Sequence, residues 1–140
     1  MRNFFAIILF TVLVLCFSCE EQGLFVRCSE CTQEEPVEAS LKITLDKNAY
    51  SPMTEVRVYE GNLEDNILYR TVNTTGVETL VVVPLNKKYS ITATYMHPNN
   101  EVFITVDSAY PRVRFDEEQC DNPCYYIYDN TVNLRLKYKY

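Results

Sequence analysis

Hydrophobic and polar residues alternate with a period of two along most of the chain after residue 40. The first clear example is LKITLD, in which Leu41, Ile43 and Leu45 alternate with polar residues. Because successive side chains of a β-strand point to opposite faces, this pattern predicts strands with one buried face. The expected strands are residues 41–46, 55–60, 67–74, 78–85, 88–96, 101–108, 112–115, 124–129 and 131–140.

Three of these strands carry further expectations. Residues 78–85, ETLVVVPL, form a continuous apolar run, which favours burial on both faces. Asp129 and Asn130 predict a tight hairpin turn before the last strand. In that strand we expect Val132, Leu134, Leu136, Tyr138 and Tyr140 to face inward, and Asn133, Arg135, Lys137 and Lys139 to face outward. A basic outer face is typical of a protected sheet edge.

No helical period of useful length follows residue 19, and short strands recur at regular spacing. The chain is therefore expected to be all-β, with a single antiparallel β-sandwich; a closed barrel is the alternative. Its length is sufficient for one domain with its own core.

The N-terminus follows a different pattern. Residues 4–17 are almost unbroken apolar sequence, about the length of a signal-peptide core and short of the roughly 20 residues of a membrane span. The run ends Cys16-Phe17-Ser18-Cys19, which resembles the bacterial lipobox, although Cys16 stands where that motif usually has leucine. The resemblance implies a signal peptide of residues 1–18 and lipidation of Cys19. A plain secretory signal or an uncleaved anchor is the alternative.

Glu20 and Glu21 follow directly and resemble the export signal of Bacteroidetes surface lipoproteins. This resemblance implies a lipid anchor in the outer membrane and favours the cell surface; a periplasm-facing position is the alternative. Residues 19–39 are acidic and polar, so we expect a solvated tether before a sandwich domain of residues 40–140. The apolar residues 24–26 within the tether are suited to dock on the domain.

The chain is acidic, with a formal net charge of −6, and its basic residues are scattered singly apart from Lys87 and Lys88. This distribution gives no electrostatic footprint for nucleic acid, and we expect no nucleic-acid partner.

Four further cysteines form two close motifs, Cys28 with Cys31 and Cys120 with Cys124. An even number of cysteines in an exported chain indicates disulfides. Cross-pairing between the motifs closes a loop of roughly 90 residues, for which chain-entropy theory gives about 4.5 kcal/mol. We favour this cross-pairing, and pairing within each motif is the alternative.

Two other chemistries use the same cysteines. Four thiolates can hold tetrahedral zinc, but C-x3-C is a less typical spacing and an exported chain meets an oxidising compartment. A redox-active C-x-x-C requires a stabilised thiolate, whereas Cys28 and Cys31 lie among acidic residues. We prefer structural disulfides and expect no metal and no cofactor.

Motifs that would indicate an enzyme are scarce. The single histidine, His97, lies in the turn sequence MHPNN without an identifiable catalytic partner. The chain has no nucleophile elbow, phosphate loop or zinc-protease motif. The acidic residues 116–121 are expected to form a solvated loop rather than a calcium site. We therefore expect no enzymatic activity, with a carboxylate pair assembled by folding as the alternative.

Tyrosine and serine suggest two glycan-related sites. The chain has 11 tyrosines and no tryptophan, and Tyr125, Tyr126 and Tyr128 share one strand. A sugar-stacking platform is one interpretation, although we expect at least one face of this strand to pack in the core. Asp107-Ser108-Ala109 resembles the O-glycosylation motif of exported Bacteroidetes proteins, which makes Ser108 a candidate for O-glycosylation.

The segments VRVYEG, ETLVVVPLNKKYSITATY and YDNTVNLRLKY, in this order, resemble small Bacteroides-type lipoproteins with an immunoglobulin-like or transthyretin-like sandwich. The resemblance covers most of residues 40–140 and carries no catalytic motif, and such lipoproteins are mostly uncharacterised. It implies a non-enzymatic, membrane-anchored lipoprotein whose disulfide-stapled sandwich binds a protein or a glycan. A structural subunit of a surface fibre or envelope complex is the alternative, and a small enzyme is the third hypothesis.

Overall fold

The fold was obtained as a computed structural model, which describes residues 26–47, 53–96 and 99–136. In these residues the expected all-β fold is confirmed, because every helix found is a single 3-10 turn. The 3-10 turns are η1 (Cys28–Glu30) and η2 (Leu63–Asp65). The strands are β1 (Glu38–Thr44), β2 (Thr54–Glu60), β3 (Leu68–Thr74), β4 (Glu78–Pro84), β5 (Tyr89–Met96), β6 (Val102–Ala109), β7 (Arg112–Asp116), β8 (Cys124–Tyr128) and β9 (Thr131–Asn133).

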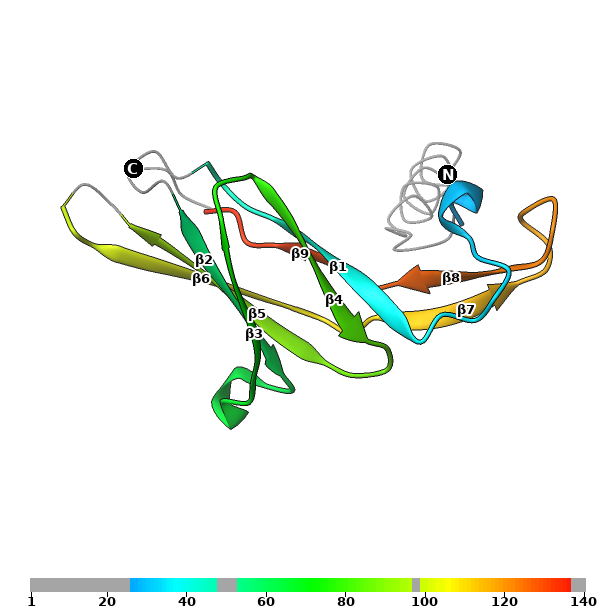
Figure 1. The fold of residues 1–140 in the computed structure, drawn as a ribbon, viewed down its shortest axis with the longest axis horizontal. Helices are drawn as coiled ribbons and strands as arrows, with labels where there is room; N and C mark the ends of the chain where they lie inside the picture. Colours follow the sequence, from blue (N-terminus) through cyan, green and yellow to red (C-terminus); the bar gives the residue numbers. More distant parts are fainter. Residues whose placement is uncertain (1–25, 48–52, 97–98, 137–140) are drawn as a thin grey trace, which may run out of the picture.

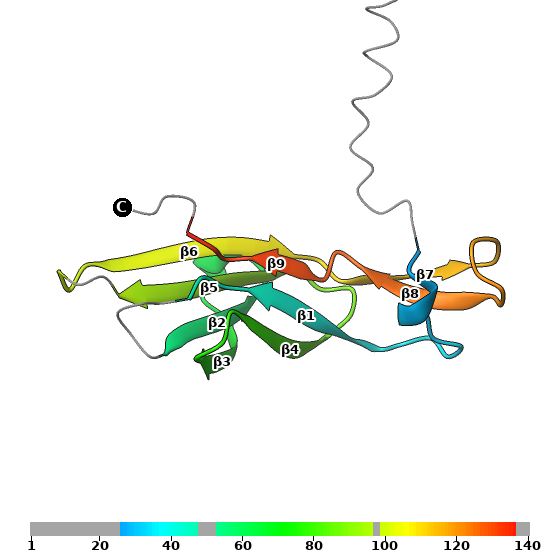
Figure 2. The ribbon, with the colours of Figure 1, turned by 90° about the horizontal axis from the view of Figure 1, so that it is seen from above.

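Two sheets pack face to face and form a β-sandwich (Figures 1 and 2). One sheet has the order β4-β1-β9 and the other β3-β2-β5-β6, and neither closes into a barrel within the described residues. Strands β7 and β8 form a separate two-stranded ribbon that extends beyond one end of the sandwich. In immunoglobulin constant domains the first two strands share a sheet. Here β1 and β2 lie in different sheets, so the strand order differs from that of an immunoglobulin constant domain.

The core lies between the two sheets and is built from the alternating apolar positions. Its members come from both inner faces, and β5 supplies four of them, including the buried aromatic rings. The core residues are Leu41, Ile43, Leu45, Val56, Val58, Val81, Val83, Tyr89, Ile91, Ala93, Tyr95, Ala109, Val132 and Leu134. A period-two pattern in sequence therefore becomes a single buried layer, which stabilises the fold through the hydrophobic effect.

Side-chain hydrogen bonds join the two sheets where the edge strands β6 and β9 meet. The Thr105 hydroxyl donates to the Leu134 carbonyl oxygen at 2.9 Å, and the Asp107 carboxylate accepts from the Asn133 amide at 2.8 Å. The buried Tyr95 hydroxyl also donates to the Leu134 carbonyl oxygen, at 2.8 Å. Burial raises the pKa of Tyr95 above its ordinary value. These bonds satisfy backbone groups of β9 and its continuation that no neighbouring strand reaches on this side.

The structure corrects the expectation that residues 78–85 are buried on both faces. Val81 and Val83 are buried, but Leu80 is 65% exposed and Val82 is 43% exposed. β4 is an edge strand of a sheet with only one inner face, and no described segment covers its outer side. The continuous apolar run therefore buries only every second residue.

The predicted hairpin at Asp129 and Asn130 is also wrong. β8 pairs with β7, whereas β9 joins the other sheet and pairs with β1 in parallel, with Ile43 opposite Val132. Asp129 has a φ of +55°, so the chain does turn sharply here. The turn moves the chain from the ribbon into the sandwich, because the inner face there offers Val132 and Leu134 a place in the core.

The last strand is shorter than expected. The ladder ends at Asn133, and Leu136 is bonded through its amide to the Asp46 carboxylate at 2.7 Å instead of to a strand backbone. Val132 and Leu134 are buried and Asn133 and Arg135 are exposed, as the alternation predicts. The expectations for residues 137–140 lie outside the described residues.

Candidate functional site

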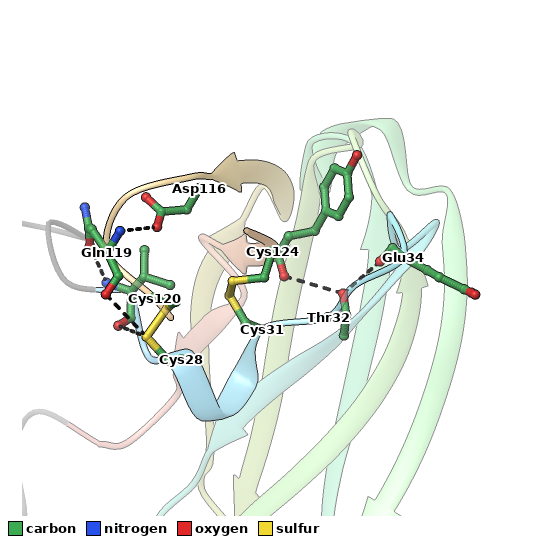
Figure 3. The surroundings of a disulfide bond; sticks show 10 residues. Cys28, Cys31, Thr32, Glu34, Asp116, Gln119, Cys120 and Cys124 are labelled. Atoms are coloured by element: carbon green, nitrogen blue, oxygen red, sulfur yellow. Dashed lines mark hydrogen bonds between the residues drawn. A yellow bond between two sulfur atoms is a disulfide. The ribbon is translucent and has the colours of Figure 1, made fainter. Parts of the chain in front are cut away.

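The N-terminal segment and the β7–β8 ribbon form one unit at the end of the sandwich. Two disulfides join Cys28 to Cys120 and Cys31 to Cys124, with Cα–Cα distances of 5.7 and 5.5 Å. This is the long-range cross-pairing that the sequence analysis favours. Figure 3 shows both bonds side by side, between the N-terminal segment and the turn that joins β7 to β8. The bonds fasten the described part of the predicted tether to the domain.

The sulfur atoms of Cys31, Cys120 and Cys124 lie within 4.8 Å of one another. Three sulfur atoms this close together resemble part of the ligand set of a zinc site. Zinc binds thiolates, however, and all four sulfur atoms here are engaged in disulfides. The close packing of the two bonds therefore serves as a double covalent staple.

Polar contacts support the staple. Thr32 and Tyr125 exchange two backbone hydrogen bonds of 2.9 and 2.8 Å, so the N-terminal segment adds a short bridge to the edge of β8. The Val26 amide donates to the side-chain oxygen of Gln119 at 3.1 Å, and the Gln119 amide donates to the Asp116 carboxylate at 2.8 Å (Figure 3). Asp116 therefore organises the acidic turn from within.

An ion pair connects η1 to the sandwich. The Lys42 ammonium on β1 contacts the Glu30 carboxylate at 3.0 Å. Its hydrogen bond and its positive charge lower the pKa of Glu30. Both side chains are about half exposed, so this pair contributes orientation more than stability.

The two faces of the ribbon differ in chemistry. Opposite residues in an antiparallel pair share a face, and Val113 lies opposite Ile127 on the apolar one. Phe115 and Tyr125 are opposite on the same face, with ring centroids 4.8 Å apart. The other face carries the pairs Arg112–Tyr128 and Arg114–Tyr126.

The structure corrects the expectation that at least one face of β8 packs in the core. Tyr125 and Tyr126 are half-buried and Tyr128 is exposed, and none of them belongs to the core. The reason is topological, because β8 pairs only with β7 in a ribbon outside the sandwich. The rings of Tyr126 and Tyr128 lie 6.3 Å apart on the same face.

An apolar row follows the outer face of β6, an edge strand. Val102, Ile104 and Val106 are 57%, 62% and 55% exposed, and Met96 on β5 lies opposite Val102. Ser108 continues this row and is exposed, so its hydroxyl is accessible to a modifying enzyme. Its glycosylation stays a prediction.

A groove of about 590 Å³ lies over the outer face of the β4-β1-β9 sheet. Mixed side chains line it, including Lys42, Leu80 and Glu78. Glu78 is the only carboxylate in this lining, so the groove does not contain the carboxylate pair that a two-acid hydrolase would need.

Several predicted positions lie outside the described residues: the signal peptide of residues 1–18, Cys19, the acidic pair 20–21, the apolar residues 24–25 and His97. Among the residues that the structure describes, no helix has the length and apolar character needed to cross a membrane.

The sequence analysis missed Arg112 and Arg114. The alternation in RVRF, facing the alternation in YYIY across the acidic turn, carried the signal for a face of paired arginines and tyrosines. It was overlooked because at least one face of that strand was expected to pack in the core.

No protein-family model, no curated protein and no solved structure matches this chain.

Proposed function

We propose that this chain is a non-enzymatic lipoprotein, anchored in the outer membrane through lipidated Cys19, whose rigid β-sandwich binds a protein or a glycan. The observation that supports a binding role is the exposed aromatic and apolar surface on a frame held by two disulfides. Exposed surfaces of this kind on a rigid scaffold are typical of recognition.

The position of the staple fits an N-terminal anchor. Cys19 is followed by only six residues before Val26, so the chain between them spans at most about 25 Å. With Cys19 in the membrane, the ribbon end of the domain lies next to the bilayer. The β5–β6 end, which lies opposite the ribbon, then points away from it (Figure 1).

Metabolic labelling with an alkyne-tagged fatty acid tests the anchor. We expect the wild-type chain and Cys16→Ala to carry the label and Cys19→Ala to lose it. Cys16 is the matched control because it lies three residues away in the same apolar run. Label retained on Cys19→Ala would refute lipidation at this position. Protease treatment of intact cells, with a periplasmic protein as control, then distinguishes the cell surface from the periplasm.

One observation favours a second candidate function, a structural subunit that assembles by strand addition. β6 is an edge strand with an exposed apolar row and no charged side chain between Val102 and Val106. Such edges are suited to pair with another strand.

Light scattering distinguishes the two functions. An assembling subunit forms oligomers that Ile104→Lys abolishes, whereas Leu80→Lys on the other sheet preserves them. Leu80 is the matched control because its side chain and that of Ile104 are similarly exposed. A wild-type chain that stays monomeric at high concentration excludes self-assembly through β6.

A further inference from the structure

The ribbon face that carries Arg112, Arg114, Tyr126 and Tyr128 is an ordered alternation of cations and aromatic rings. The register of β7 with β8 places each arginine directly opposite a tyrosine. Along each strand these residues are two positions apart, which corresponds to about 7 Å. The face therefore carries a grid of two guanidinium groups and two phenol rings.

The two guanidinium groups are available for a ligand. Both arginine side chains are exposed, and neither takes part in an ion pair among the described residues. Arg112 lies over the ring of Tyr110 at 4.1 Å, which orients its guanidinium plane and leaves its N–H edge free to donate. In a chain with a net charge of −6, this local positive charge selects an anionic partner.

The carboxylate on the same face forms no ion pair with either arginine among the described residues. Asp116 lies two residues beyond Arg114, but its carboxylate accepts the Gln119 amide inside the turn. The apolar ribbon face behind the grid and the two disulfides at its turn end hold the strands in place. Cys124 itself lies on the face of the grid, opposite Asp116. A preorganised surface loses little conformational entropy when it binds.

We propose that this face binds an acidic polysaccharide, with the guanidinium groups holding its carboxylates and the tyrosine rings stacking on its sugar rings. Arginine matches carboxylate geometry with two parallel hydrogen bonds, and a tyrosine ring offers a flat apolar surface with a polar tip. This inference rests on the binding role proposed above and names the surface and the ligand class.

Affinity electrophoresis of the full chain, purified with its disulfides intact, tests the proposal. Native gels contain polygalacturonate, neutral dextran or polyglutamate, which has carboxylates without sugar rings. We expect retardation by polygalacturonate alone, and a binding constant about tenfold weaker for Arg112→Gln/Arg114→Gln. The matched control is Arg70→Gln/Arg135→Gln, which removes the same charge from exposed arginines outside the ribbon and is expected to bind like wild type.

A Tyr128→Ser variant tests the stacking, and we expect it to weaken binding to polygalacturonate about fivefold. Circular dichroism verifies that each variant is folded.

Equal retardation by polyglutamate would show that charge alone is recognised and would overturn the proposal. Polygalacturonate binding that both double variants weaken equally would move the site elsewhere while a glycan-binding role survives. A wild-type chain that polygalacturonate does not retard overturns the inference, while the anchor is decided separately by the fatty-acid labelling.

Discussion

The two disulfides lie in parallel, and this arrangement predicts that their contributions to stability are strongly coupled. Cys28–Cys120 closes a loop with a sequence separation of 92 residues, and Cys31–Cys124 closes one of 93 residues. Chain-entropy theory gives about 4.5 kcal/mol for the first bond that closes such a loop. The second bond then closes only a small ring of about eight residues, which gives about 2.5 kcal/mol.

Removing either disulfide alone therefore costs about 2.5 kcal/mol, because the other bond still closes the long loop. Removing both costs about 7 kcal/mol, which exceeds the sum of the single effects by about 2 kcal/mol. This excess comes from the unfolded chain, since the long loop opens only when both bonds are absent.

The measurement is a double-mutant cycle of urea denaturation, with the variants Cys28→Ala/Cys120→Ala, Cys31→Ala/Cys124→Ala and the quadruple variant. Far-ultraviolet circular dichroism follows unfolding, since the chain contains no tryptophan. The m-value rises most in the quadruple variant, because its unfolded state is the most expanded. Additive single effects, or a single removal that costs as much as the double one, would refute the reasoning.

Three further predictions concern the core, the contact between β6 and β9, and a turn. Burial raises the pKa of Tyr89 to about 12, so the stability that its neutral hydroxyl contributes is complete below pH 10 and is lost as the pH rises from 10 to 12. Denaturation at several alkaline pH values should show a fall of about 2–3 kcal/mol in the free energy of unfolding, and this fall should be absent in Tyr89→Phe. Asp107→Ala removes the bond to the Asn133 amide and should lower the free energy of unfolding by about 1–2 kcal/mol, whereas the exposed neighbour substitution Ser108→Ala changes it little. Gly61 has a φ of +83° and a Cβ there would lie 3.1 Å from a carboxylate oxygen, so Gly61→Ala should lower the melting temperature by several degrees; an unchanged melting temperature would contradict the strain argument.

The sequence was sufficient for the strands because alternation is a local property. Tyr89, Ile91, Ala93 and Tyr95 alternate with polar residues in the sequence, and all four face the core. The four-cysteine cross-pairing was also accessible, because loop closure favours it on general grounds. The start of β1 at Glu38 falls close to the expected boundary.

Strand pairing could not be predicted in the same way, because it depends on contacts between distant segments. The local signal of Asp129 and Asn130 is compatible with a hairpin, yet the parallel pairing of β9 with β1 places Val132 in the core. The apolar run of β4 is likewise ambiguous, since its sequence does not indicate that the outer face lacks a covering layer. The Arg–Tyr face could not be predicted for the same reason, because it exists only when β7 and β8 pair with each other outside the sandwich.

The double staple also determines how the domain responds to mechanical force. Tension applied to the N-terminal segment divides at Cys28 and Cys31 between two covalent routes. One route continues along the backbone into β1, and the other crosses the sulfur bridges into the β7–β8 ribbon. A load held at the ribbon would thus pass from the N-terminal segment to the ribbon without shearing any strand of the sandwich, so the hydrophobic core would carry no tension.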